Sequence, residues 1–376
     1  MKKHKYIFFT LLLVLFFQIS TLNPTFSLPS LSAGNIAALV PEKAFFFPSN
    51  VHQATFTSFE RDEKSSLVFT GDIMLARNVE YLMNINGKEY PFAAMDLKSF
   101  ATNAAVIGNF ESAMSPEHIT TPAFGMTFST ASSALPHLKE AGFTHLSLAN
   151  NHSYDYAEDG YQNTVALLQK NKFVPFGNGK SLGQESVTYI DIPQGRIALI
   201  AVNASEKIPD IALLYKIIGS ASRQSDLQIV VIHWGTEYKT THSSTQELLA
   251  KVLVDAGADL IVGHHPHVVE DVQVVDGVLV FYSLGNYIFD QYFSDDVQTG
   301  LVLSVSLTGT PEVSLMPVTS LDHMSQPSRM PIAKHQEFLD ALAKKSDKNL
   351  ASSIRKGVIP LGSVVASSQK TTMMVR

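Results

Sequence analysis

Three histidines stand within four residues in the stretch Gly263-His264-His265-Pro266-His267. They follow a short apolar run, Leu260-Ile261-Val262, that is typical of a buried strand. Histidines at the exit of a strand can direct two imidazoles at one ion, and imidazole is a common ligand of zinc, iron, nickel and copper. A histidine-rich surface turn is the alternative. The spacing favours a metal site.

Similar polar groups follow four other apolar runs of the chain. In chain order these groups are Asp72, Asn109 with Glu111, Asn151 with His152, and His233. Ligands of open α/β sheets collect outside the carboxyl ends of the strands, so the pattern predicts that these side chains meet. Carboxylates and imidazoles of this kind suit a two-metal hydrolytic site, in which a spare histidine protonates the leaving group.

Each of these residues could also have a purely structural role. Asp72 follows a glycine and suits a turn or a helix cap, as Glu111 does. Asn151 suits a left-handed turn, and His233 beside Trp234 suits a packed core. Such coincidences at five strand ends are less probable together than singly, so the sequence favours one shared site.

Composition limits the class of protein. The chain has 376 residues, of which 45% are hydrophobic and 16% charged, which is enough to bury a large core. The net charge of −6 argues against a nucleic-acid-binding protein. Because there is no cysteine, disulfides, thiolate ligands and a cysteine nucleophile are excluded. A metal site therefore has to use His, Asp, Glu and Asn.

The N-terminus has the form of an export signal. Lys2, Lys3 and Lys5 precede an apolar run over residues 6–17. The run is shorter than the roughly 20 residues that span a bilayer, although an extension to residue 22 permits a marginal anchor. A cleaved signal and a retained anchor both remain open. Either one predicts an extracytoplasmic domain, secreted or anchored in the cell membrane.

The apolar runs alternate with helical patterns early in the chain and with hairpins later. Asp276-Gly277 predicts a hairpin between two apolar runs, and Ser244 with Glu247 predicts a capping box. The other expected elements are helices over residues 136–141, around 161–168 and over 335–345, and strands over 300–307 and 313–318. This order predicts a layered α/β fold with two sheets or one mixed sheet.

Six stretches, in their order along the chain, resemble the poly-γ-glutamate capsule-biosynthesis (CapA-like) family, a relative of the calcineurin-like metallophosphoesterases. They are Thr70–Arg77, Gly108–Ser112, Ala149–Tyr156, His233–Tyr238, Gly257–His267 and Tyr282–Asp290. The resemblance implies a metallophosphoesterase-like four-layer α/β/β/α sandwich with mixed sheets. It implies metal ligation by Asp72, Glu111, Asn151, His233, His265 and His267. It also implies that His152 is the general acid and that Arg77 holds an anionic group.

Two positions depart from the metallophosphoesterase pattern. Met74 stands where a histidine is usual, and Asn109 stands where an aspartate is usual. One metal, two metals and a site that binds without hydrolysis all remain open, as does the choice among His264, His265 and His267. We expect a divalent metal ion, with manganese, iron and zinc as the candidates.

The sequence patterns, together with the resemblance, divide the chain into four parts. We expect a signal peptide or membrane anchor over residues 1–22, a linker over 23–64, the CapA-like domain over 65–330, and a C-terminal helix with a polar tail over 331–376. The implied role is the synthesis, export or anchoring of an anionic extracellular polymer.

The resemblance implies membrane polymer-synthase subunits as partners. The sequence has no Gly-x-x-x-x-Gly-Lys-Ser/Thr loop to bind ATP, so we expect a partner to supply the energy for polymerisation. The other expected contacts are the anionic polymer itself and the membrane, which the N-terminus would reach. A stand-alone secreted hydrolase of phosphoesters or amides and a non-catalytic polymer-binding scaffold are the alternatives.

Overall fold

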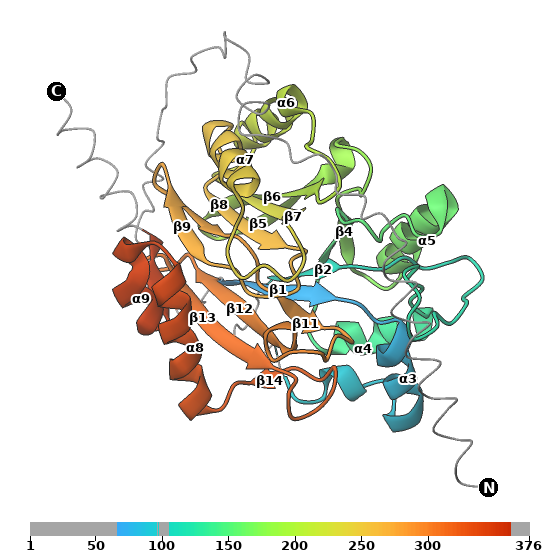
Figure 1. The fold of residues 1–376 in the computed structure, drawn as a ribbon. Coiled ribbons are helices and arrows are strands. Elements are labelled where there is room, and N and C mark those ends of the chain that lie inside the picture. Colours follow the sequence, from blue (N-terminus) through green and yellow to red (C-terminus); the bar gives the residue numbers. More distant parts are fainter. Residues whose placement is uncertain (1–65, 96, 98–104, 362–376) are drawn as a thin grey trace, which may run out of the picture. The chain divides into compact units, whose positions relative to one another are not determined.

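The computed structural model describes residues 66–95, 97 and 105–361, which belong to one compact unit (Figure 1). The predicted signal or anchor over residues 1–22, the linker over 23–64 and the last residues of the tail, 362–376, lie outside the described residues. None of the helices in the described part is long and apolar enough to cross a membrane.

The first sheet is mixed, and in the described part of the chain it has nine strands. Its central strands β1 to β4 pair in parallel, while β12 and β13 continue the sheet on the other side of β1 in antiparallel fashion. Its strands are β1 (Ser66–Ile73), β2 (Ala105–Phe110), β3 (His145–Ser147), β4 (Val174–Phe176), β11 (Asn286–Ile288), β12 (Thr299–Ser306), β13 (Glu312–Thr319), β14 (Ser328–Arg329) and β15 (Val358–Pro360).

The second sheet is also mixed, in the order β5-β6-β7-β8-β10-β9. Strands β6, β7, β8 and β10 run in parallel, and the two outermost strands are antiparallel to their neighbours. The predicted hairpin at Asp276-Gly277 is confirmed, since Val275 pairs with Val278. The strands are β5 (Val187–Ile192), β6 (Gly195–Ala204), β7 (Leu227–Trp234), β8 (Leu260–His264), β9 (Val272–Val275) and β10 (Val278–Phe281).

Helices cover the outer face of each sheet. Helices α3, α4 and α5 pack on the first sheet, and α6 and α7 pack on the second. Helices α8 and α9 pack against the core between the sheets. The helices are α3 (Arg77–Asn86), α4 (Leu135–Glu140), α5 (Ala157–Lys170), α6 (Ile211–Ser222), α7 (Ser244–Asp255), α8 (Ile332–Lys345) and α9 (Ala351–Arg355).

Three apolar clusters define the four layers. Alternate residues of β1 face opposite ways, so Leu67 and Phe69 enter the cluster between the two sheets while Val68 joins the cluster under α3 to α5. The third cluster joins the second sheet to α6 and α7. The predicted α/β/β/α sandwich with mixed sheets is therefore confirmed, and burial on both faces explains why these strands are apolar throughout.

Several local predictions need correction. The capping box of α7 is formed by Ser243 and Gln246, one residue before the predicted pair Ser244 and Glu247, because the side chain of Ser243 accepts from the backbone N–H of Gln246. Residues 348–360, which we had placed in the polar tail, form a 3-10 turn, α9 and β15. Ile354 and Ile359 are buried in the core between the sheets, which explains why this segment is ordered.

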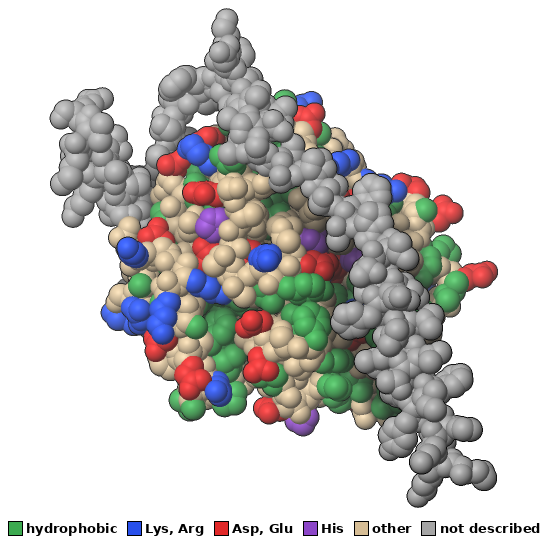
Figure 2. Space-filling view, in the orientation of Figure 1, with side chains coloured by type: hydrophobic (Ala, Val, Ile, Leu, Met, Phe, Trp, Pro, Cys, Tyr) green, Lys and Arg blue, Asp and Glu red, His purple; other side chains and the backbone are tan. Residues whose placement is uncertain are grey.

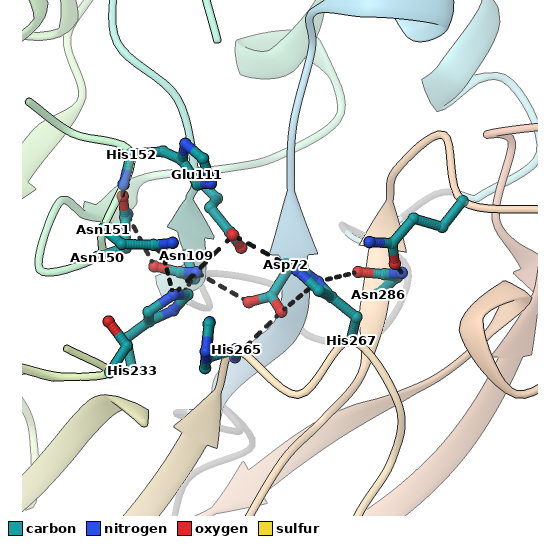
Figure 3. A network of polar contacts seen from close by, with 12 residues as sticks. Asp72, Asn109, Glu111, Asn150, Asn151, His152, His233, His265, His267 and Asn286 are labelled. Atoms are coloured by element: carbon teal, nitrogen blue, oxygen red, sulfur yellow. Dashed lines mark hydrogen bonds and ion pairs between the residues drawn. The ribbon is translucent and has the colours of Figure 1, made fainter. Parts of the chain in front are cut away.

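The topology brings the polar strand ends to one edge. In the first sheet β1, β2 and β3 are parallel neighbours, and in the second β7 and β8 are. Their carboxyl ends carry the groups that follow the apolar runs, and the loops of both sheets converge there (Figure 3). Gly71 permits one close approach, because a Cβ atom at this position would lie 2.0 Å from the carbonyl oxygen of Gly285.

Candidate metal centre

Two carboxylates, those of Asp72 and Glu111, are fully buried at the ends of the neighbouring strands β1 and β2 (Figure 3). Burial raises the pKa of Glu111 well above its usual value, and nearby acidic groups add to this effect. Burial also opposes ionisation of Asp72, but hydrogen bonding and the charges of His267 and His264 hold its pKa below the usual value. Buried carboxylates of this kind need cationic or hydrogen-bonding partners.

Three imidazoles surround these carboxylates. His233 at the end of β7 has its Nε2 atom 3.9 Å from Oε1 of Glu111. His267 reaches both acids, with Nε2 3.7 Å from Oε1 of Glu111 and Nδ1 3.5 Å from Oδ2 of Asp72. The backbone N–H of His265 donates to Oδ2 of Asp72 at 3.2 Å. The tertiary structure thus joins residues that lie more than 190 positions apart.

The protonation of the imidazoles differs. Burial lowers the pKa of His233 well below its usual value and lowers that of His265 to about 4. Burial would lower the pKa of His267 too, but the charge of Glu111 and the hydrogen bond to Asp72 raise it to about 9. Two neutral imidazoles and one protonated imidazole therefore face two acids at neutral pH.

The donor atoms fit a divalent cation. Both oxygens of Glu111 and Nδ1 of His265 are buried and have no hydrogen-bond partner within the described residues. Two groups of ligand atoms lie within 4.8 Å of one another: Glu111 with His265 and His267, and Asp72 with Glu111 and His233. Glu111 belongs to both groups. Carboxylate oxygens and imidazole nitrogens are the ligands that zinc, manganese and iron accept.

Asn109 contacts two of the candidate ligands through its side-chain amide. Its side-chain nitrogen donates to Oδ1 of Asp72 at 2.8 Å and contacts Nδ1 of His233 at 3.2 Å. With the amide oriented this way, Nδ1 of His233 is the acceptor, and its Nε2–H donates to Oδ1 of Asn151 at 2.9 Å. Met74 lies in the outer core, where its sulfur contacts the backbone nitrogen of Ala76.

His152 lies at the margin of the centre and is about 9% exposed. Its Nδ1 atom is 2.9 Å from Oδ2 of Asp155, and its ring stacks on Phe128 with a centroid distance of 3.9 Å. The same Asp155 oxygen accepts from the backbone N–H of Phe128 at 2.5 Å. These contacts fix the orientation of the imidazole and engage its Nδ1 atom.

Arg77 is not part of the cluster in this structure. Its guanidinium forms two hydrogen bonds with Asp290, and it lies 4.6 Å from the ring centroid of Phe128. The side chains of Arg77 and Asp290 are only 10% and 3% exposed. That Arg77 holds an anionic group stays a prediction, and its charge is already balanced by Asp290.

The sequence analysis assigned no role to Asn286, Asp155 or Phe128. Asn286 accepts from Nδ1 of His267 at 3.0 Å. It follows the apolar run over residues 278–284, so the expectation that polar residues after such runs meet at one edge would have selected it. Asp155 stands three residues after His152, but nothing local distinguishes it from an acid in the first turn of a helix. His264 is outside both ligand groups, and its Nε2 bonds the carbonyl oxygen of Thr70 at 3.0 Å.

Backbone strain also concentrates here. Of the non-glycine residues with positive φ in the described part, four surround the centre: Arg77 at 49°, Tyr238 at 63°, His265 at 99° and His267 at 59°. Such conformations cost free energy and persist where surrounding contacts over-determine them, which is common at functional sites. The turn that carries the two histidines is therefore held in shape before any ligand binds.

Comparison with known proteins relates most of the chain to one family. The model of the family described as "Bacterial capsule synthesis protein PGA_cap" matches residues 66–291. The PGA biosynthesis protein CapA of Bacillus subtilis is 30% identical over 313 residues, which cover 79% of this chain and 82% of that protein. The capsule biosynthesis protein CapA of Bacillus anthracis is also 30% identical, over 74% of this chain and 72% of its own.

Solved structures with a similar arrangement are more distant. A phosphatase from Mycoplasma pneumoniae is 14% identical with a TM-score of 0.45, over 69% of this chain and 95% of its own. The NAD nucleotidase of Haemophilus influenzae is 14% identical with a TM-score of 0.41, over 76% of this chain and 63% of its own.

Proposed function

Because the chain belongs to the bacterial capsule synthesis protein family, we propose that it serves the synthesis, export or anchoring of an anionic extracellular polymer and carries a metal-dependent phosphoesterase-like site. Poly-γ-glutamate is the polymer that we assign by analogy, since the B. subtilis relative is described as a PGA biosynthesis protein. The observation that carries the metal site is Glu111, a fully buried carboxylate that is shared by two groups of potential ligands.

The residues that would hold the metal are Asp72, Glu111, Asn151, His233, His265 and His267. A bound divalent cation would polarise a phosphoryl or carbonyl oxygen of the substrate. Manganese, iron and zinc suit this donor set, which has no thiolate. Asn109 and Asn286 orient Asp72, His233 and His267 by hydrogen bonds. Binding of a metal by Nε2 of His233 would move the proton off that nitrogen.

His152 is the residue to which we assign proton transfer. Its Nδ1–H donates to the carboxylate of Asp155, so Nε2 is the nitrogen at which the ring takes up and gives away a proton. Protonation of the leaving group from this atom would complete hydrolysis of a phosphoester or an amide. Phe128 holds the ring from its face and limits its rotation.

We place the domain outside the cytoplasm, next to a membrane-bound polymer synthase. This location is supported by the three lysines and the apolar run at the N-terminus. The need for a partner follows from the absence of a nucleotide-binding loop in the sequence, because polymerisation requires a source of energy. Two relatives from Mycobacterium tuberculosis, each described as a probable polyglutamine synthesis accessory protein, fit an accessory role.

The test combines metal analysis with genetic complementation. We expect the purified chain, prepared without chelator or His-tag, to contain one or two equivalents of a transition metal. We expect a deletion strain to lose surface polymer and to regain it with the wild-type gene but not with Glu111→Gln. Glu337→Gln, an exposed substitution on α8, is the matched control and should complement fully.

Two other results would change the assignment. If the Glu111→Gln variant binds no metal and still restores surface polymer, the fold acts as a polymer-binding scaffold. Normal surface polymer in the deletion strain, together with hydrolysis of phosphoesters or γ-glutamyl amides by the purified chain, would favour a stand-alone secreted hydrolase.

A further inference from the structure

The loop between β2 and α4 exposes large apolar side chains beside the candidate metal centre. Phe124 is 96% exposed, Met126 64% and Ile119 61%. The segment over residues 119–136 contains no Asp, Glu, Lys or Arg. Single exposed apolar residues are ordinary on a protein surface, but three within eight residues of an uncharged loop indicate an interaction site.

Two more exposed rings lie on neighbouring loops. Tyr238 is 43% exposed and Phe293 is 66% exposed, and their ring centroids are 5.1 Å apart in an edge-to-face arrangement. We call the five residues Ile119, Phe124, Met126, Tyr238 and Phe293 the apolar rim.

Side-chain contacts connect both parts of the rim to the metal centre. Arg77 donates to the carbonyl oxygen of Gly125 at 3.4 Å and is paired with Asp290. The residue after Asp290, Gln291, donates to the hydroxyl of Tyr238 at 3.0 Å. The ring of Tyr238 lies 6.2 Å from that of His267. The rim and the histidine turn therefore belong to one side of the molecule.

The views of the molecule agree with this grouping. In Figure 1 the teal loop after β2 reaches the right edge of the domain, on the side of α3 and α5. Figure 2 shows hydrophobic side chains in green at the same edge, and α8 lies on the opposite side of the view.

Hydrogen bonds hold the exposed part of the loop in shape, and Phe128 anchors it in the core. Its backbone turns at Pro122, whose carbonyl oxygen accepts from the N–H of Gly125 at 2.8 Å. Thr121 bonds the carbonyl oxygen of Thr127 across the loop at 3.0 Å. At its base His118 pairs with Glu80 of α3 at 2.7 Å. Polar contacts thus fix the loop while Phe124 and Met126 stay in water, which is unfavourable without a partner.

We propose that the apolar rim inserts into the interfacial region of a lipid bilayer and so holds the metal centre at the membrane surface. This inference rests on the extracytoplasmic, membrane-associated location proposed above. The loop that carries Ile119, Phe124 and Met126 has no charged side chain and suits the boundary between headgroups and acyl chains, where charge is costly. Tyr238 and Phe293 stand close to charged residues, Glu237 and Lys239 in one case and Asp295 and Asp296 in the other, so they form the more polar side of the rim.

Only a few inserted side chains would be needed to hold the domain at the membrane, because the N-terminal part of the chain would already tether it there. The apolar N-terminal run would tether the domain, so a few inserted side chains act at a high effective concentration of lipid. The residues of the predicted linker, 23–64, would reach about 140 Å when fully extended, which exceeds the roughly 50 Å diameter of a domain of this size. The linker therefore permits the rim to face the bilayer. A polymer or precursor held at the membrane would then meet the metal centre directly.

The absence of cysteine allows a direct test with the full chain. Phe124→Cys would be labelled with an environment-sensitive nitrobenzoxadiazole dye and reconstituted into vesicles of phosphatidylglycerol and phosphatidylethanolamine. Ile332→Cys is the matched control, because Ile332 is also apolar and is 92% exposed at the start of α8. Vesicles with brominated acyl chains report contact with lipid, and flotation reports binding of the chain as a whole.

We expect a blue-shifted emission at position 124 that brominated lipid quenches at least twofold, and neither effect at position 332. Water-like emission at 124 in a chain that floats with the vesicles would overturn the rim contact and leave the membrane location intact. Failure of the chain to float would overturn the location and the contact together. A blue shift without quenching would mean that protein covers the loop, either a partner or a second copy, and would also overturn the proposal.

Discussion

The side-chain amide of Asn109 donates a 2.8 Å hydrogen bond to Oδ1 of Asp72 and keeps this buried carboxylate paired. Metallophosphoesterases usually have an aspartate at this position, which would place two carboxylates against each other. The amide therefore makes the centre compatible with a folded chain even before a metal binds. Asn150 completes the arrangement, because its side-chain nitrogen donates to Oδ1 of Asn109 at 3.2 Å.

Asn109→Asp tests this relationship. Without metal, the substitution replaces a donor by a second buried acid, so we expect a loss of about 1–3 kcal/mol in the free energy of unfolding. Added manganese or zinc should raise the Tm of the variant more than that of the wild type. Thermal unfolding with chelator and with metal measures both effects. Asn349→Asp on the exposed surface is the control, and an unchanged Tm of metal-free Asn109→Asp would contradict the prediction.

The histidine turn supplies a second prediction. His265→Ala and His267→Ala should each reduce the bound metal at least tenfold, because each removes a member of the ligand groups. His264→Ala should retain the metal, since His264 bonds the backbone of Thr70 instead. Elemental analysis of the three purified variants gives the answer. Metal loss in His264→Ala with a native circular dichroism spectrum would show that the ligand set is wrong.

Metal affinity should rise with pH. The charges of Glu111 and Asp72 raise the pKa of His267 to about 9 against the effect of burial, so the metal has to displace a proton from this ring. Below pH 9 we expect the apparent affinity to increase by up to about tenfold per pH unit for one displaced proton. Calorimetric titration in buffers with different ionisation enthalpies counts the protons released. Binding that is independent of pH between 6 and 9 would be inconsistent with His267 as a ligand.

The buried carboxyl group of Glu270 should make the free energy of unfolding depend on pH. Burial raises its pKa from 4.5 to about 8, and one oxygen has no hydrogen-bond partner among the described residues. Between these two pH values the folded chain binds more protons than the unfolded chain. The free energy of unfolding should therefore fall as the pH rises through this window, by on the order of a few kcal/mol.

Glu270→Gln should remove this dependence and be the more stable protein at pH 8. Urea unfolding of the variant and the wild type from pH 5 to pH 8 measures the difference. Glu247→Gln, on the exposed side of α7, should keep the wild-type slope. Parallel curves for Glu270→Gln and the wild type would refute the assignment.

The pair of Arg77 and Asp290 should stabilise the fold. Removal of either partner leaves a buried charge alone, so Arg77→Ala and Asp290→Ala should each cost about 3–5 kcal/mol. The double variant should lose clearly less than the sum, which a double-mutant cycle measures. The exposed pair of Lys334 and Glu337 should show a coupling below about 0.5 kcal/mol. Additive losses at Arg77 and Asp290 would mean that the ion pair does not form in solution.

Much of the fold followed from local pattern. Continuous apolar runs such as residues 229–232 and 260–262 predicted buried strands, because a strand covered on both faces has no polar side. The strands β5 and β6 and the helix α6 were missed, although β6 contains the continuous apolar run of residues 197–202. Strand β15 was missed because its pairing with β13 depends on packing against α8 and α9, which no local pattern contains.

The sequence by itself determined which residue types are available for chemistry and that they follow strands. Asp72, Glu111, His233 and the histidine turn as a whole were selected on that basis, since parallel strands end at a common edge. It could not determine distances between residues that are far apart in the chain. Only the tertiary structure places Asn109 between Asp72 and His233, and only it engages Arg77 with Asp290. These relationships depend on how the two sheets pack face to face, and that packing is a property of the whole core.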